Sequence, residues 1–189
     1  MPGELADQVL ATWRRHNEIL LYLLDTIPSE GLSATPTGSR GRDVARQFAH
    51  IARVRTGWVH YHVTGRKPKL PRHDKGKRPT KAQLKKLLHE SGAGVHKFLE
   101  RGVRGEVRPR LFGKQVVRWI GYLIAHESHH RGQILLALKQ TGMRLPDEAA
   151  AGRSSSDPEI VQNGEQHQTC PLHSSPGGGH GPSDPAEPA

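Results

Sequence analysis

The sequence predicts an all-α protein, an up-and-down four-helix bundle with a disordered C-terminal tail. Apolar residues recur at spacings of three, four and seven in four long segments, which is the period of amphipathic helices. The alternation typical of strands is rare. After residue 146 the chain is mostly Gly, Pro, Ser, Ala and polar residues, with too few large apolar side chains to offset the entropy of ordering. We therefore expect a bundle domain over residues 1–146 and a disordered tail over residues 147–189.

The first helix is predicted over residues 5–27. Pro28 ends it, because proline cannot continue a helix. Asn17 lies within the apolar stripe, and we interpret it as a buried amide satisfied by backbone or water; a supporting position beside a bound metal is the alternative. The stripe itself consists of Leu10, Trp13, Leu20, Leu21 and Leu24.

The second helix follows Asp43, whose carboxylate can cap or charge-stabilise its first turn. Its apolar stripe carries His50 at the edge and consists of Val44, Ile51, Val54, Trp58 and Tyr61. We expect the aromatic residues Trp58, Tyr61 and Trp119 to be core packing, with a substrate wall as the alternative reading.

A third helix is predicted over residues 80–100, with Thr80 as N-cap and with Gly92 and Gly94 weakening it. The fourth helix is predicted over residues 113–141, with Gly142 as its C-terminal stop. A long connection separates the second and third helices.

The most informative segment lies in the fourth helix and reads His126-Glu127-Ser128-His129-His130-Arg131-Gly132-Gln133. On a helix, His126 and His130 stand one turn apart and about 40° from each other around the axis, which suits two ligands of one metal. His129 points away from the apolar stripe. The segment therefore predicts two metal ligands, His126 and His130.

A mononuclear site normally needs a third protein ligand, and His50 on the second helix is the candidate. Taken alone, His50 is more typical of a satisfied core histidine. Together with the inward pair it favours a metal site, because three buried imidazoles without a metal or carboxylate partners are costly. Imidazole nitrogen suits zinc, nickel, copper and iron alike.

Two motifs together carry a family resemblance. Phe48-Ala49-His50-Ile51 in an early helix and His126-Glu127-x-His129-His130-Arg131-Gly132-Gln133 in a late one resemble the DinB-like (DinB/YfiT) family of metal-dependent four-helix-bundle proteins, over about residues 5–145. The resemblance implies that His50, His126 and His130 form the metal triad. It also implies a divalent metal, zinc or nickel in particular, and homodimers in many members. Some branches transfer low-molecular-weight thiols such as bacillithiol or mycothiol.

From the triad we expect thiol S-transfer or hydrolysis on a small electrophilic substrate, with a ligand activated at an open metal position. Glu127, which faces inward, is a tentative catalytic residue that orients a metal-bound histidine or acts as acid or base. A structural ion pair with Arg131 is an equal alternative. A non-catalytic, stress-related metal-binding protein remains open as a second function.

The net charge of +10 is concentrated in the long connection. Such a loop is compatible with a basic nucleic-acid-associated protein, because its positive charges could neutralise phosphates. The loop has no aromatic residues between the basic ones, and the sequence shows no recognised motif of a DNA-recognition helix, so we do not expect nucleic acid as a partner. An anionic small substrate is an equally physical use of the positive field. No membrane-spanning segment is expected, and the single cysteine, Cys170, fits a reducing compartment, so we expect a cytoplasmic protein.

Overall fold

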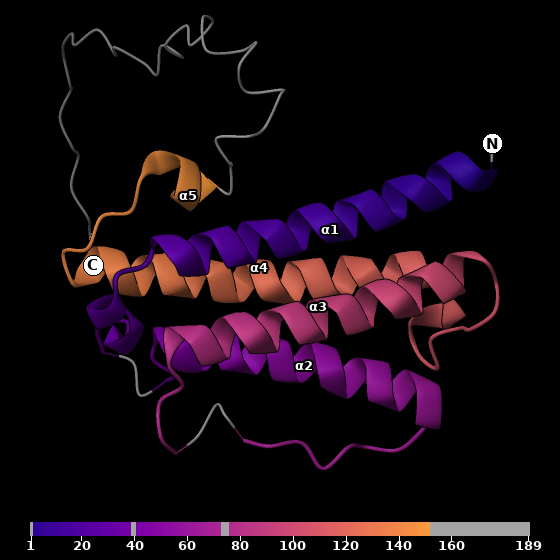
Figure 1. Cartoon of the computed structure of the whole chain (residues 1–189), viewed down its shortest axis with the longest axis horizontal. Helices are drawn as coiled ribbons and strands as arrows, with labels where there is room; N and C mark the ends of the chain where they lie inside the picture. The colour runs from indigo at the N-terminus through magenta and orange to yellow at the C-terminus, as the bar shows by residue number, and fades with distance from the viewer. Residues whose placement is uncertain (1, 39–40, 73–75, 152–189) are drawn as a thin grey trace, which may run out of the picture. The chain divides into compact units, whose positions relative to one another are not determined.

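The structure, a computed structural model, describes residues 2–38, 41–72 and 76–151. The predicted bundle is present as four long helices, which are α1 (Pro2–Thr26), α2 (Val44–Thr64), α3 (Lys81–Val103) and α4 (Val116–Gln140) (Figure 1). Three short helices accompany them, namely η1 (Ser29–Ser33), η2 (Phe112–Lys114) and α5 (Asp147–Ala151). The described ranges contain no strand, which confirms the all-α prediction.

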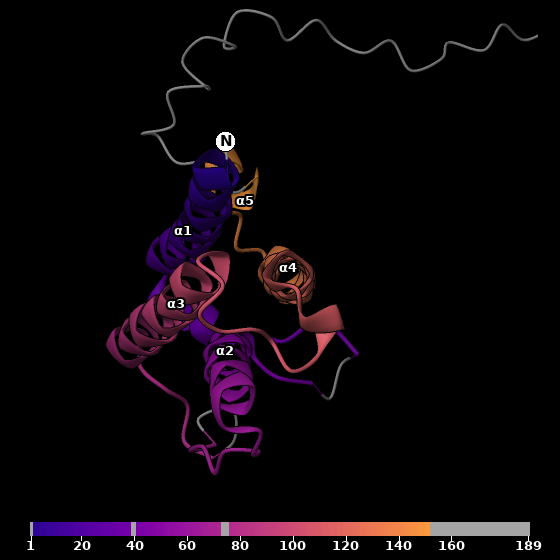
Figure 2. The ribbon, with the colours of Figure 1, turned by 90° about the vertical axis from the view of Figure 1, so that its right-hand side faces the viewer.

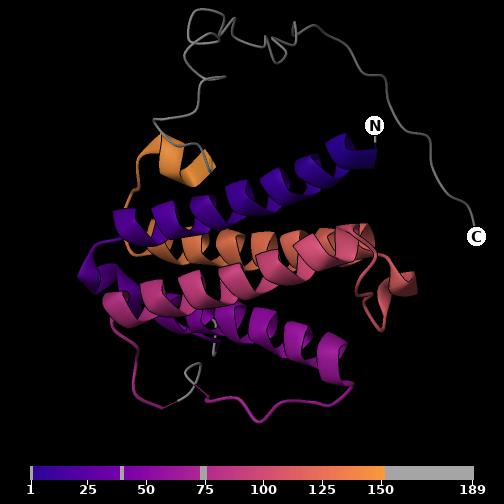
Figure 3. The ribbon, with the colours of Figure 1, turned by 45° about the vertical axis from the view of Figure 1, so that its right-hand side comes forward.

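The long connection determines how the helices are directed. It returns along the bundle after α2, so α2 and α3 run in the same direction, opposite to α1 and α4, and do not alternate as in the predicted up-and-down order (Figures 1 and 3). Seen along the bundle, the order around its axis is α1, α3, α2, α4 (Figure 2). The α2 helix packs extensively on α3 and more sparsely on α4. Of the two seams that α2 forms, the one with α4 is therefore the more open.

The predicted caps of the middle two helices are confirmed. The Asp43 side chain accepts a hydrogen bond from the Arg46 backbone N–H at 2.8 Å, which satisfies a donor in the first turn of α2. Thr80 and Gln83 form a reciprocal capping box at the start of α3. Both helices thus begin directly after the capping residues that the sequence predicted.

The start of α4 differs from the prediction. The helix begins at Val116 instead of residue 113, because Phe112, Gly113 and Lys114 all have positive φ values of about 60°. This left-handed conformation cannot be continued into a right-handed helix. The turn carries the Phe112 ring against Trp58 and Tyr122, with ring centroids 5.4 and 5.0 Å away.

Two apolar clusters fill the interior, and a polar layer lies between them in every long helix. One cluster includes Leu20, Phe48, Leu84 and Ile134. The other includes Trp13, Phe98, Trp119 and Leu123. Between these positions the helices carry buried polar side chains, which are His16 in α1, Arg55 in α2, Ser91 in α3 and Glu127 in α4. Candidate functional residues therefore lie at mid-bundle.

The short α5 helix lies within the segment expected to be disordered. It contacts α1, and Ala149 is fully buried, so residues 147–151 are an ordered extension of the bundle. The rest of the predicted tail, residues 152–189, is outside the described residues, as is Cys170. None of the described helices combines the length and apolarity needed to cross a membrane.

Candidate metal centre

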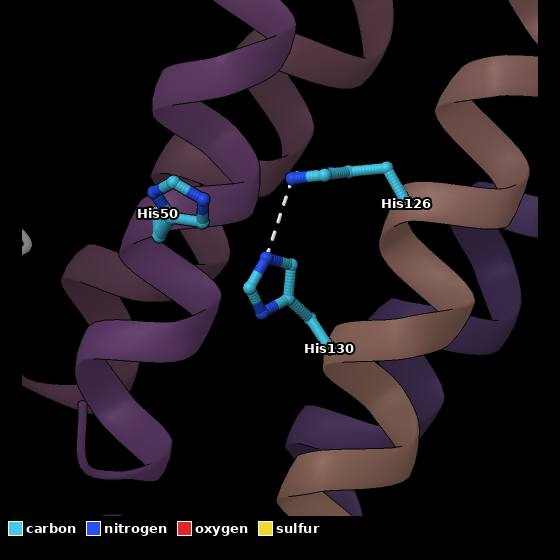
Figure 4. Close-up of side chains that lie close together, drawn as sticks. All are labelled: His50, His126 and His130. Atoms are coloured by element: carbon cyan, nitrogen blue, oxygen red, sulfur yellow. Dashed lines mark hydrogen bonds between the residues drawn. The ribbon is translucent and has the colours of Figure 1, made fainter. Parts of the chain in front are cut away.

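The three predicted histidines meet across the α2–α4 seam. His50 projects from α2, while His126 and His130 project toward it from successive turns of α4 (Figure 4). Each offers one ring nitrogen, and these three atoms lie within 4.8 Å of one another. Among the described residues this is the one group of three or more histidine, cysteine or carboxylate side chains close enough to share an ion.

The geometry of the α4 pair fits one metal ion. Two nitrogens held about 2.0–2.1 Å from a tetrahedral zinc ion are about 3.3 Å apart. The Nε2 atoms of His126 and His130 are separated by 3.3 Å. The His50 ring centroid lies 5.5 Å from that of His126 and 4.7 Å from that of His130. The His50 ring therefore lies next to both rings of the α4 pair.

A glutamine that sequence reasoning missed orients one of these rings. Gln47 Oε1 lies 2.6 Å from His130 Nδ1 and can only accept, so Nδ1 carries the proton. The lone pair of His130 is then on Nε2, the atom that faces His126. Gln47 in turn donates from Nε2 to Gln133 Oε1 at 3.0 Å, and Gln133 reaches His129 Nε2 at 2.9 Å. Histidine ligands of metals usually have such a partner on the second ring nitrogen.

Gln133 belongs to the late motif but had no assigned role, and the network shows that it supports Gln47. A signal for Gln47 was present in the sequence. It precedes His50 by three residues and so lies on nearly the same face of α2. His129 is exposed, as predicted for a residue outside the triad.

The α4 histidines are held in their neutral form. Burial, followed by the neighbouring His126 and His50 rings, lowers the pKa of His130 to about 4. Burial also lowers the pKa of His126, although the negative charge of Glu127 acts to raise it. Arg42 contributes to lowering both pKa values. Unprotonated imidazoles are the form that binds metal.

Glu127 has different partners from those predicted. It is fully buried, and its carboxylate accepts from Arg55 Nε at 2.8 Å and Arg55 Nη2 at 2.6 Å, with His16 Nε2 at 2.8 Å. The expected ion pair with Arg131 is thus replaced by one with Arg55, from α2. Burial disfavours the Glu127 charge, but Arg55 and His16 outweigh it and lower the pKa of this carboxyl. These contacts favour the ionised form of the Glu127 carboxyl.

The spacing of His126, Glu127 and His130 is also that of the His-Glu-x-x-His signature of zinc proteases, in which the glutamate is the general base. In this bundle both oxygens of Glu127 are engaged by Arg55 and His16. A depressed pKa and occupied lone pairs do not suit a carboxylate that must take up a proton from water. The His-Glu-x-x-His signature is present in the sequence, but the contacts of Glu127 do not support a role as general base.

Arg55 extends the buried network to the remaining helices. Its Nη1 donates to Asn17 Oδ1 at 2.6 Å, and its guanidinium lies 4.8 Å from the Trp13 ring centroid. The partner of Asn17 is therefore an arginine side chain, in place of the backbone or water expected. Gly92 on α3 makes this possible, since a Cβ there would stand 2.6 Å from Asn17 Oδ1. Glycine lowers the helix propensity of α3 at position 92, and this close approach of Asn17 explains why a glycine is needed there.

Two hollows lie beside the triad. One, of about 410 Å³, borders Arg42, Gln47, His129 and His130. The other, of about 440 Å³, lies along α2 from Arg53 onward and borders Trp58 and Tyr61. Trp119 is fully buried as expected of a core residue, whereas Trp58 and Tyr61 are half-buried and line this second hollow.

The comparison with protein families agrees with the motifs. Residues 1–150 match the DinB family, which covers all four long helices and the three histidines. The chain belongs to the DinB family. A comparison with curated proteins gave no match. For this DinB protein, the family and the histidine cluster are compatible with metal dependence, and the reaction has to be argued from the site.

Proposed function

We propose that this DinB protein binds one divalent metal ion through His50, His126 and His130 and uses it in catalysis on a small electrophilic substrate. The observation that carries the proposal is the convergence of three imidazole nitrogens from two helices within 4.8 Å. The 3.3 Å separation of the two α4 nitrogens supports a shared ion. Zinc or nickel is the proposed metal, because both accept imidazole ligands.

The residues around the triad prepare it for this role. Burial keeps His126 and His130 unprotonated, and Gln47 fixes the tautomer that presents Nε2 of His130 to the ion. A divalent ion held by three imidazoles retains an open position and lowers the pKa of the water or thiol bound there. Thiol S-transfer and hydrolysis are the two reactions we propose. A low-molecular-weight thiol is the co-substrate of the first.

Metal analysis of the full chain tests the binding step. Protein prepared without chelator is expected to hold about one divalent ion per chain, as three histidines make one site. His126→Ala and His130→Ala are expected to lose the ion. His129→Ala is the matched control, because His129 is next in sequence to His130 but exposed and outside the triad, and it should retain the ion. Equal metal content in native protein and in the triple alanine variant of the triad would reject the proposal.

Activity assays separate an enzyme from a binder. The metal-loaded protein is incubated with electrophiles and with bacillithiol, mycothiol, glutathione or coenzyme A, and hydrolysis is measured without thiol. Metal-dependent turnover that is lost in His126→Ala is expected. Full metal occupancy with no turnover in any of these assays would favour the alternative, a non-catalytic metal-binding protein. A cytoplasmic location is part of the proposal and rests on the single cysteine of the chain.

A further inference from the structure

The hollow along α2, called here the Arg53 hollow, is largely apolar. It has a volume of about 440 Å³, within the range of small-molecule sites. Val54, Trp58 and Tyr61 line it from α2, and Leu70 of the following connection lies opposite Gly57. Aromatic and aliphatic walls of this kind accommodate the apolar body of a ligand.

The Arg53 hollow begins one helical turn from the metal triad. Arg53 and Val54 follow His50 by three and four residues, so all three share one face of α2. A second link runs through α4. The Tyr122 ring stacks on His126 with centroids 6.0 Å apart, and it also contacts Trp58, at 5.7 Å. Aromatic surface therefore extends from the triad toward the hollow.

The charge of the Arg53 hollow is one-sided. Arg53 and Lys67 line it, and the described residues around it include no carboxylate. The Nε atom of Arg53 is buried and has no hydrogen-bond partner among the described residues. The Arg53 side chain as a whole is half-buried and lines the hollow, and a guanidinium binds a planar anion such as a carboxylate through parallel hydrogen bonds. Arg53 and Leu70 also line a neighbouring hollow that includes Glu90, but the ion-pair partner of Glu90 is Lys86, at 3.9 Å.

We propose that the Arg53 hollow is the substrate pocket of the metal centre and takes amphipathic anions. The apolar body of the ligand, aromatic or branched alkyl, lies against Trp58 and Leu70. Its carboxylate, sulfonate or phosphate bonds Arg53 and Lys67. The assignment of this ligand as substrate rests on the proposed function, whereas its binding to the hollow does not require the metal.

Binding of 4-phenylbutyrate to metal-free full chain, measured by calorimetry, tests the pocket directly. The uncharged 4-phenylbutan-1-ol and the cationic 4-phenylbutylamine have the same phenyl ring and four-carbon chain as 4-phenylbutyrate. They differ from it in the charge of the terminal group. The carboxylate is expected to bind about tenfold or more tightly than the alcohol, the value of one charge-assisted hydrogen bond. The amine is expected to bind most weakly of the three. Equal affinity for all three compounds would overturn the proposal.

Two variants change the pocket in different ways. Arg53→Ala removes the charge and is expected to weaken 4-phenylbutyrate about tenfold or more while leaving the alcohol unchanged. Gly57→Leu fills the hollow and is expected to weaken both compounds. A Cβ at Gly57 meets only Leu70 Cδ1, at 3.8 Å, and leucine favours the helix more than glycine, so this variant should fold. Circular dichroism verifies folding of both.

Lys97→Ala is the matched charge control, because Lys97 is exposed on α3 and lines no hollow described above. It should bind 4-phenylbutyrate like the native chain. Arg42→Ala tests the hollow on the other side of the triad. Loss of binding in Arg42→Ala with retention in Arg53→Ala and Gly57→Leu would place the anion there and reject the proposal.

Cobalt-loaded protein then connects the pocket to the metal. Adding 4-phenylbutyrate is expected to change the visible absorption bands of the cobalt ion, and Gly57→Leu is expected to abolish that change while retaining the ion. Unchanged bands at saturating ligand would reject the hollow as the substrate pocket of the metal centre. If the protein binds no cobalt but still binds 4-phenylbutyrate through Arg53, the proposed function fails and the anion pocket stands.

Discussion

His126 and Glu127 are neighbours in the chain, yet they belong to two polar clusters of opposite character. The His50, His126 and His130 cluster is partly exposed, and it contains only imidazoles whose nitrogens face one another. The cluster of Glu127, Arg55, His16 and Asn17 lies deeper, and its charges are matched by hydrogen bonds of 2.6–2.8 Å. The first cluster brings three ring nitrogens close together, while the second pairs a carboxylate with a guanidinium.

This difference shows how buried polar groups divide into two roles. A paired network across α1, α2 and α4 offsets the desolvation of its charges, and removing one partner leaves the other buried without a counter-charge. A cluster of lone pairs facing one point is costly unless a ligand joins it, which is typical of binding sites. The Arg55–Glu127 pair thus forms a rigid support one residue away from a metal ligand.

The largest expected effect comes from breaking the Arg55–Glu127 pair. Glu127→Ala leaves the Arg55 guanidinium buried and unpaired, which should lower the free energy of unfolding by about 3–5 kcal/mol. Urea unfolding of metal-free protein measures this. His126→Ala is the control from the adjacent position and should cost less than about 1 kcal/mol, because its half-buried ring is not part of the ion-pair network. Equal losses in the two variants would remove the distinction between the clusters.

A smaller effect is expected from Gln47, which supports the triad from outside. Gln47→Ala frees the Nδ1 proton of His130 from its acceptor and should weaken zinc binding about 10- to 100-fold, as for other partners of histidine ligands. Competition with a coloured chelator gives the affinity. Gln133→Ala should have a weaker effect, because Gln133 reaches the triad only through Gln47. Native zinc affinity in Gln47→Ala would show that His130 needs no such orientation.

The smallest predicted effect concerns His62, a buried histidine that belongs to neither cluster. It is 4% exposed, its Nδ1 accepts from the Arg110 backbone N–H at 3.2 Å, and its ring stacks on Trp58. Burial, followed by the Arg110 charge, lowers its pKa from 6.5 to about 4. The unfolded chain therefore takes up a proton near pH 6.5 that the folded chain refuses until about pH 4. The stabilisation from neutral His62 is complete above pH 6.5 and is lost as the pH falls toward 4.

Replacing His62 by Gln tests this sign. Between pH 7.5 and pH 5.5 the free energy of unfolding of native protein should fall by about 1 kcal/mol more than that of His62→Gln. All other ionisable groups are the same in both proteins, so their contribution cancels in the comparison. Parallel pH curves for the two metal-free proteins would show that His62 is as easily protonated as in the unfolded chain.

Much of the fold was predictable because it depends on local periodicity and caps. Apolar spacing located the four long helices, and Asp43 and Thr80 marked two starts. The start of α4 was placed three residues early, since nothing in the letters at Phe112 and Lys114 reveals a left-handed backbone. The continuation of order into α5 was missed because five residues of alanine and acid carry little apolar signal, although packing on α1 orders them.

The sequence by itself determined that His126 and His130 share a helix face, because residues four positions apart lie one turn apart on the same face of an α-helix. It also made His50 the candidate third member. Only the tertiary structure decided the partners of Glu127, which are 72 and 111 residues away, and of His130, whose Gln47 acceptor is 83 residues away. The same holds for Arg53 and Lys67, which only the fold brings to one hollow. Such contacts depend on how whole helices are placed against one another, and no local pattern in the chain encodes that placement.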